Sequence, residues 1–159
     1  MSRASVVGTL LLSRGLSPCH DFIIQRDTLC DKRNVPMEKQ MKKINVDNNW
    51  EMHRVGDDEW ITAKVPGSVY GDLLQAGKME DPFWKDNEIE ALKLMDYDYE
   101  YRTSFSCDDE LLGSDEVILR FEGLDTIADI LLNGVKLGHA DNMHRTWEYS
   151  VKDILKQTD

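Results

Sequence analysis

Short runs of alternating apolar and polar residues recur along most of the chain, which is the pattern of half-buried β-strands. The clearest run places aromatic or β-branched residues at every second position: Tyr97, Tyr99, Tyr101, Thr103 and Phe105. The positions between them are polar: Asp98, Glu100, Arg102 and Ser104. Such a strand buries one face and exposes the other. The same alternation predicts strands near residues 61–65, 117–121 and 146–151.

The dipeptide Asn133-Gly134 predicts a β-hairpin. It lies between two apolar runs, residues 127–132 and 135–137. Asn and Gly tolerate the positive φ angles of a type I′ turn, whose twist matches that of paired antiparallel strands. The fold is therefore expected to be antiparallel β.

Turn residues separate the predicted strands from a short helix. Residues 56–58 predict a turn, and Pro66-Gly67 ends the next strand. Ser68 can cap a helix that runs through Ala76 and stops at Gly77. The apolar residues expected on one face of this helix are Val69, Leu73 and Leu74. With about seven short strands at turn-punctuated intervals, the sequence predicts an all-β sandwich or jelly roll with one or two short helices.

Composition narrows the classes of partner. The 159 residues suit one domain, and 41% of them are hydrophobic, enough for a core. The net charge of −11 argues against nucleic acid, whose binders carry basic patches. No apolar run approaches the length of a membrane span. The cysteines Cys19, Cys30 and Cys107 are odd in number and have no paired spacing, which favours reduced thiols and a cytoplasmic location.

The first 36 residues differ in pattern from the rest. Residues 1–18 begin with basic character and contain a short apolar patch, residues 6–12, so they weakly resemble a signal peptide. Arg14 follows at once and no small-residue cleavage site is present. We therefore expect residues 1–36 to be an unstructured leader or an over-extended start, and residues 37–159 to form the domain.

Two clusters of possible metal ligands have simpler explanations. Asp96, Asp98 and Glu100 alternate along one strand and so share its polar face, without the glycine and terminal glutamate of a calcium loop. His139, Asp141 and His144 follow the hairpin in a loop. A solvated surface explains the first cluster and a turn the second, so we predict no metal and no cofactor.

Several further motifs occur in a fixed order between residues 44 and 155. They are Val65-Pro66-Gly67-Ser68-Val69-Tyr70, Leu73-Leu74-Gln75-Ala76-Gly77, Asp81-Pro82-Phe83, Asn87-Glu88, Tyr101-Arg102-Thr103, Phe121-Glu122-Gly123-Leu124-Asp125-Thr126, Ile130-Leu131-Leu132-Asn133-Gly134 and Asp141-Asn142-Met143. As a set they resemble the N-terminal domain of the β-mannosidases in glycoside hydrolase family 2.

This resemblance implies a galactose-binding-like jelly roll packed against a barrel that carries two catalytic glutamates. The full enzymes remove terminal, non-reducing β-D-mannose by a retaining mechanism, in which two carboxylates about 5 Å apart act as nucleophile and acid/base. By this resemblance the chain ends at Asp159 before the later jelly-roll strands and before the barrel, so residues 37–159 are expected to be an incomplete N-terminal jelly-roll domain. We therefore expect no catalytic residue here, no activity of the chain alone, and two partners: β-mannosides and the missing barrel of the same polypeptide.

The loop from Asp81 to Glu88 is the predicted site of sugar contact. Trp84 offers a ring for stacking, while Asn87 and Glu88 offer hydrogen-bonding groups on a loop, where binding residues concentrate. The resemblance places this Asn-Glu pair near the junction with the barrel. The competing explanation is a loop-stabilising Asx turn and helix cap. Two alternatives for the whole chain also stay open: a stand-alone carbohydrate-binding module, or the matching domain of a β-galactosidase or β-glucuronidase.

Overall fold

The computed structural model describes residues 4–12, 21–28 and 40–155, which form ten strands and three helices. The first five strands are β1 (Ala4–Leu12), β2 (Asp21–Thr28), β3 (Gln40–Asn45), β4 (Glu51–Arg54) and β5 (Ile61–Thr62). The other five are β6 (Tyr99–Cys107), β7 (Glu116–Glu122), β8 (Ala128–Leu132), β9 (Val135–Ala140) and β10 (Thr146–Ser150). The helices are α1 (Val69–Gln75), α2 (Asn87–Leu94) and α3 (Asp109–Leu112).

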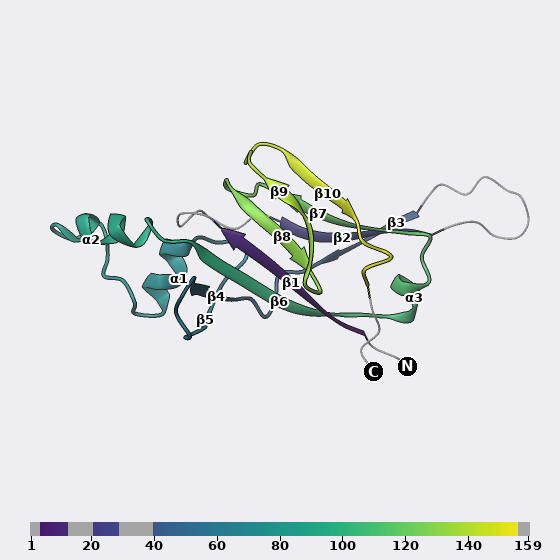
Figure 1. Cartoon of the computed structure of the whole chain (residues 1–159), viewed down its shortest axis with the longest axis horizontal. Coiled ribbons are helices and arrows are strands. Elements are labelled where there is room, and N and C mark those ends of the chain that lie inside the picture. The colour runs from purple at the N-terminus through teal and green to yellow at the C-terminus, as the bar shows by residue number, and fades with distance from the viewer. Residues whose placement is uncertain (1–3, 13–20, 29–39, 156–159) are drawn as a thin grey trace, which may run out of the picture.

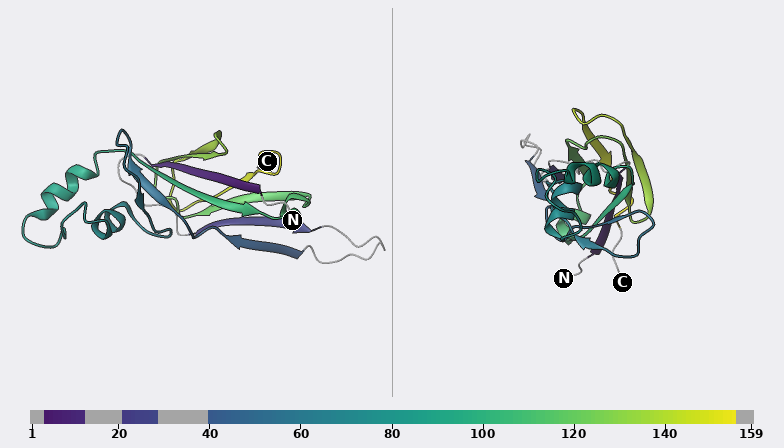
Figure 2. Two further views of the ribbon diagram at one scale, coloured as in Figure 1. Left: turned by 90° about the horizontal axis from the view of Figure 1, so that it is seen from below. Right: turned by 90° about the vertical axis from the view of Figure 1, so that its left-hand side faces the viewer.

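The strands build two antiparallel sheets (Figure 1). The six-stranded sheet has the order β5-β4-β6-β1-β8-β9, and the four-stranded sheet has the order β10-β7-β2-β3. Figure 2 shows α1 and α2 beyond one end of the sheets, with α2 projecting furthest. The all-β sandwich with a few short helices is confirmed.

The core follows the alternation seen in the sequence. On β7, every second residue is fully buried: Val117, Leu119 and Phe121. On β6, the buried residues are Tyr99, Tyr101, Thr103 and Cys107, while Phe105 is only partly buried. Tyr97 was expected on the same face, but it precedes β6 and is exposed, because the chain reaches the sheet only at Tyr99.

The central hairpin forms as predicted. Asn133 and Gly134 have φ angles of 49° and 77°, so both adopt the left-handed conformation of a type I′ turn between β8 and β9. The Asn133 amide donates to the backbone oxygen of Ile154 at 3.0 Å. The hairpin tip is thereby tied to the chain that follows β10.

The structure has strands in two parts of the first 36 residues, for which the sequence predicted an unstructured leader or an over-extended start. Residues 4–12 form β1, which pairs with both β6 and β8, and residues 21–28 form β2, which pairs with β7 and β3. A run of four to eight apolar residues is as typical of an internal strand as of a signal peptide, and length alone does not separate the two. Residues 1–3, 13–20 and 29–36 lie outside the described part, as do Cys19 and Cys30.

Helix α1 starts and stops where the sequence predicted. The Ser68 hydroxyl accepts a hydrogen bond from the Gly71 N–H at 3.2 Å, and Gly77 follows the helix with a φ of 66°. Val69 and Leu73 are buried, but Leu74 is exposed and Asp72 is buried in its place. The predicted face was therefore wrong by one position, because Asp72 finds polar partners inside the domain.

Helix α2 was not predicted, since residues 81–88 were interpreted as a loop. It carries one buried residue, Ala91, and presents Ile89 and Leu92 to solvent. This leaves it without the apolar stripe by which helices are recognised in a sequence. Within the described residues, no helix has the length and apolar character needed to cross a bilayer.

Candidate sugar-binding end of the domain

The predicted sugar-contacting residues lie at the end of the domain where α2 projects (Figures 1 and 2). The chain leaves α1, runs through the loop at residues 81–86, forms α2 and then enters β6. Trp84 lies in this loop, and Asn87 and Glu88 lie in the first turn of α2. The structure therefore brings the three predicted residues into one short segment.

Hydrogen bonds within the segment hold the loop closed. The Asp81 carboxylate accepts from the Phe83 N–H at 2.9 Å, which is an Asx turn. The Asn87 side-chain amide donates to the Asp81 backbone oxygen at 3.0 Å, and its N–H donates to the Trp84 oxygen at 3.2 Å. Asn87 thus stabilises the loop through its donors, while its amide oxygen accepts no hydrogen bond from the described residues.

The aromatic side chains of this loop point into solvent. Phe83 is 96% exposed and Trp84 is 65% exposed. The Lys85 ammonium lies 5.9 Å from the Trp84 ring centroid, within the range of a cation–π contact. An exposed indole on a loop is a surface on which the apolar face of a sugar can stack.

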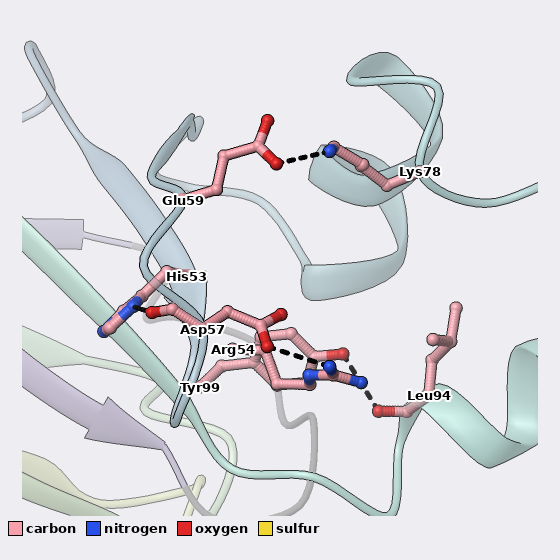
Figure 3. Close-up of polar contacts among 7 residues, drawn as sticks. All are labelled: His53, Arg54, Asp57, Glu59, Lys78, Leu94 and Tyr99. Atoms are coloured by element: carbon pink, nitrogen blue, oxygen red, sulfur yellow. Dashed lines mark hydrogen bonds and ion pairs between the residues drawn. The ribbon is translucent and has the colours of Figure 1, made fainter.

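A cleft of about 200 Å³ lies beside this segment, between the turn after β4 and the ends of α1 and α2 (Figure 3). Its lining residues include Arg54, Asp57, Glu59, Lys78, Leu94 and Tyr99. The full lining comes from five elements, β4, β5, α1, α2 and β6, and from their connections. No sequence motif links them, which is why sequence reasoning missed them.

Charges in this cleft are balanced in pairs (Figure 3). The Arg54 guanidinium contacts the Asp57 carboxylate at 2.8 Å, and the Lys78 ammonium contacts Glu59 at 2.7 Å. The hydrogen bond from Arg54 lowers the pKa of Asp57 below its ordinary value. Because each cation already has an anion, the cleft suits a neutral ligand that exchanges hydrogen bonds better than it suits a phosphate.

Two side chains stabilise the wall of the cleft through contacts with backbone oxygens. A ring nitrogen of His53, Nδ1, lies 2.7 Å from the Asp57 backbone oxygen. The Tyr99 hydroxyl donates to the Leu94 oxygen at 2.9 Å, and burial raises the pKa of Tyr99. Tyr99 therefore stays protonated and ties the C-terminal end of α2 to the sheet.

A second cleft, of about 370 Å³, lies along α2, and its lining includes Asn87. It shares Arg54 and Lys78 with the first cleft. The Arg54 guanidinium also lies 4.4 Å over the ring of Tyr97, which lines this second cleft. The two clefts connect the predicted residue Asn87 to a charged and aromatic surface that the sequence did not indicate.

The acidic residues considered as calcium ligands have other neighbours. Glu100 lies 3.2 Å from a ring nitrogen of His53, and the Asp98 backbone oxygen accepts from the Val55 N–H. His53 in turn stacks on Trp60 with ring centroids 3.9 Å apart. This side of β6 is a surface of cross-strand pairs.

The residues after the hairpin form a turn. His139 contacts Asp129 at 2.7 Å, and the Asn142 side-chain oxygen accepts from the His144 N–H at 2.9 Å. The Asn142 backbone oxygen also accepts from the Trp147 indole at 3.2 Å. In the part of the chain that the structure describes, histidine, cysteine, aspartate and glutamate side chains form no group suited to a metal.

The two antiparallel sheets and their short helices place the domain among the β-sandwiches. Residues 50–159 match the family described as the glycosyl hydrolase 2 galactose-binding domain-like domain, and the chain belongs to this family. Apart from β1, every strand of the six-stranded sheet lies in the matched region. Both clefts and the loop at residues 81–88 lie there as well.

Individual relatives point to one kind of glycosidase. The chain is 28% identical over 117 residues to the β-mannosidase of Capra hircus and 35% identical over 117 residues to β-mannosidase B of Emericella nidulans. These matches cover 74% and 69% of this chain, and 13% of each relative. A solved structure of a β-D-mannosidase from Dictyoglomus thermophilum is 43% identical, with a TM-score of 0.69, over 70% of this chain and 14% of that one. The chain thus spans about one eighth of the length of the curated relatives it matches.

Proposed function

We propose that this chain is the N-terminal, non-catalytic domain of a β-mannosidase that removes terminal, non-reducing β-D-mannose residues from β-mannosides with retention of configuration. The main support is the 43% identity to a solved structure of a β-D-mannosidase. The two catalytic carboxylates of a retaining glycosidase belong, in this proposal, to a barrel outside this chain. The chain alone is then inactive, and its partner is the barrel of the same polypeptide.

Within that enzyme, the end of the domain with Trp84, Asn87 and Glu88 borders the sugar pocket. Trp84 supplies an exposed ring, and the amide oxygen of Asn87 can accept from a sugar hydroxyl while its NH₂ group holds the loop. Glu88 is exposed in the first turn of α2, beside Asn87. The adjoining cleft, with its balanced charges, favours a neutral sugar as the ligand.

The kinetic test uses the longer polypeptide that carries this domain. We expect Asn87→Ala to lower kcat/KM for an aryl β-mannoside by about tenfold or more, which corresponds to a lost hydrogen bond of about 1.4 kcal/mol in the transition state. Trp84→Ala should raise KM. Asn142→Ala is the matched control, because this asparagine holds a turn in the β9–β10 connection and lines neither cleft.

Three outcomes decide the proposal. Unchanged kinetics for Asn87→Ala together with a lower Tm would assign Asn87 to loop stability alone. Faster hydrolysis of an aryl β-galactoside or β-glucuronide than of the β-mannoside would overturn the sugar assignment. Hydrolysis of an aryl β-mannoside by the 159-residue chain itself would overturn the non-catalytic role.

A second candidate function is a stand-alone carbohydrate-binding module. It is favoured by one observation, the exposed Trp84 ring on a sandwich end, since jelly rolls often bind sugars alone. The coding sequence downstream of Asp159 distinguishes the two candidates. A reading frame that continues into a barrel with two catalytic glutamates supports the enzyme, whereas a stop codon together with binding of this chain to mannan supports the module. In either case the cytoplasm stays our predicted compartment.

A further inference from the structure

Two internal strand positions of the sandwich are filled from outside the family-matched region. Strand β1 lies between β6 and β8, and β2 lies between β7 and β3 (Figure 1). The family match begins at residue 50, so β1 and β2 precede it, whereas β6, β7 and β8 lie within it. The matched region therefore contributes most of the flanking strands but not the strands between them.

Strand β1 holds the six-stranded sheet together. It pairs with β6 along its whole length, from Ala4 opposite Cys107 to Leu12 opposite Tyr99. Its second half also pairs with β8, with Gly8 opposite Leu132. Without β1, the sheet would separate into β5-β4-β6 and β8-β9. The backbone groups of β6 and β8 on that side would then lose their partners.

The position taken by β1 is deep in the domain. Gly8 is buried, and the residues opposite it on both neighbours, Thr103 and Leu132, are buried as well. Unpaired backbone groups at such a depth are strongly unfavourable, so the position must be occupied by a strand. The same holds along β7, where β2 pairs from Asp21 opposite Glu122 to Asp27 opposite Glu116.

The register of β1 is only weakly fixed by its sequence. Apolar residues stand at neighbouring positions, in the pairs Val6-Val7 and Leu10-Leu11, so a shift by one residue still presents apolar side chains to both faces. A strand with strict alternation would bury polar groups after such a shift. Strand β1 therefore fits by backbone pairing and general apolar character, which is how added strands bind to sheets.

We propose that residues 40–155 form a strand acceptor with two sites, one between β6 and β8 and one along β7, and that β1 and β2 occupy these sites as displaceable strands. The competing occupant is an antiparallel, largely apolar strand from the remainder of a longer polypeptide of this family. The matched relatives are about seven to eight times as long as the stretch they share with this chain, so they have such segments available. The proposal rests on family membership and the strand pairing, and it does not depend on the sugar specificity proposed above.

A disulfide lock on the full 159-residue chain tests the occupancy. Thr9 lies opposite Leu131, and Cα atoms of facing residues in antiparallel strands are about 4.5–5.5 Å apart, within the range of a disulfide. We expect Thr9→Cys with Leu131→Cys, in a Cys19→Ser and Cys30→Ser background, to form an intramolecular disulfide on oxidation. The matched control is Leu10→Cys with Leu131→Cys, because Leu10 faces Ile130 in the register and the pair is displaced by one residue, so it should not join. Peptide mapping under non-reducing conditions measures both.

The same lock tests displacement. A fluorescein-labelled peptide with the sequence of residues 4–28, with serine for Cys19, is added to the reduced and oxidised forms of the Thr9/Leu131 variant. We expect fluorescence anisotropy to show binding to the reduced form and at least tenfold weaker binding to the oxidised form. A peptide with Thr9→Pro and Ile24→Pro should not bind, because proline removes N–H groups that pair with both neighbouring strands. Circular dichroism of the reduced form checks that it is folded.

Each contrary result overturns part of the proposal. Absence of the Thr9–Leu131 disulfide, or its formation no faster than in the control, would show that β1 does not occupy the site. Equal binding of the labelled peptide to both forms would show that it does not enter the site between β6 and β8 and would overturn displacement of β1. Binding to neither form would show that the strands are not displaceable.

Discussion

The interior of the sandwich and its projecting end use the same aromatic residues in opposite ways. In the interior, Trp50 is 1% exposed and its indole donates to the Val46 oxygen at 2.9 Å. At the projecting end, Phe83 and Trp84 lie in solvent, and α2 adds the exposed residues Ile89 and Leu92. A large apolar side chain stabilises a domain by about 1.5–3 kcal/mol when it is buried and by almost nothing when it is exposed.

This difference separates the residues that stabilise the fold from the residues that are available to contact another molecule. The sheets and their core fix the fold, whereas the segment at residues 81–94 adds exposed apolar area that the domain itself does not use. Four large apolar side chains exposed within one short segment make it a candidate interaction surface. The relatives are much longer than this chain, which is consistent with a surface that meets the rest of an enzyme.

The largest contrast is expected between two tryptophans. Trp50→Ala should lower the free energy of unfolding by about 3–5 kcal/mol, because it opens a cavity in the core and removes a buried hydrogen bond. Trp84→Ala should change it by less than about 0.5 kcal/mol, since the ring is exposed. Urea unfolding of this chain, followed by circular dichroism, measures both. Equal losses for the two variants would mean that the loop is packed in solution and that the contrast does not hold.

A smaller effect is expected from a single hydroxyl. The Tyr101 hydroxyl donates to the buried Asp72 carboxylate at 2.8 Å. Tyr101→Phe removes this donor, leaves the carboxylate with the Lys64 N–H at 3.0 Å, and should cost about 1–3 kcal/mol. Tyr97→Phe is the matched control at the exposed end and should be neutral. A thermal unfolding series would contradict the assignment if both variants unfolded at the temperature of the unmodified chain.

The elements that could be predicted from sequence are those whose signal is local. The Asn133-Gly134 turn needs two residues with positive φ, and the cap at Ser68 needs one hydroxyl three residues before an N–H. The alternation of β6 and β7 reports directly which face is buried. Each of these signals is complete within about ten residues, so a single sequence contains it.

The elements that were missed depend on residues far apart in the chain. Asp72 is buried on α1 because the Lys64 N–H and the hydroxyl of Tyr101, 29 positions later, donate to its carboxylate. The cleft at Arg54 and Lys78 forms where separate turns meet, and Asn87 joins it through α2. Strand β1 could not be recognised from the sequence because its partners, β6 and β8, lie about a hundred residues further along the chain. Pairing at such separation leaves no periodic signal in the strand itself.

The smallest expected effect concerns two carboxylates, Asp72 and Asp57, whose contributions to the stability of the fold should change with pH in opposite directions. Burial raises the pKa of Asp72 above its ordinary value of 3.8, although Tyr101 and Lys64 donate hydrogen bonds that act in the other direction. The folded state thus holds a proton at Asp72 more tightly than the unfolded state does. The contribution of Asp72 to stability is fully present below pH 3.8 and is lost as the pH rises through the folded-state pKa.

Asp57 at the projecting end should behave in the opposite way. The hydrogen bond from Arg54 lowers its pKa, so its contribution is present above pH 3.8 and is lost as the pH falls through the folded-state value. We therefore expect Asp72→Asn to gain stability relative to the unmodified chain as the pH rises from about 4 towards 7, the range just above the ordinary carboxyl pKa. Asp57→Asn should instead lose stability relative to the unmodified chain as the pH rises from below the folded-state pKa of Asp57 to about 4, and should change little above that. Urea unfolding at several pH values measures both, and differences of the same sign would mean that interior and surface carboxylates are not distinguished by burial.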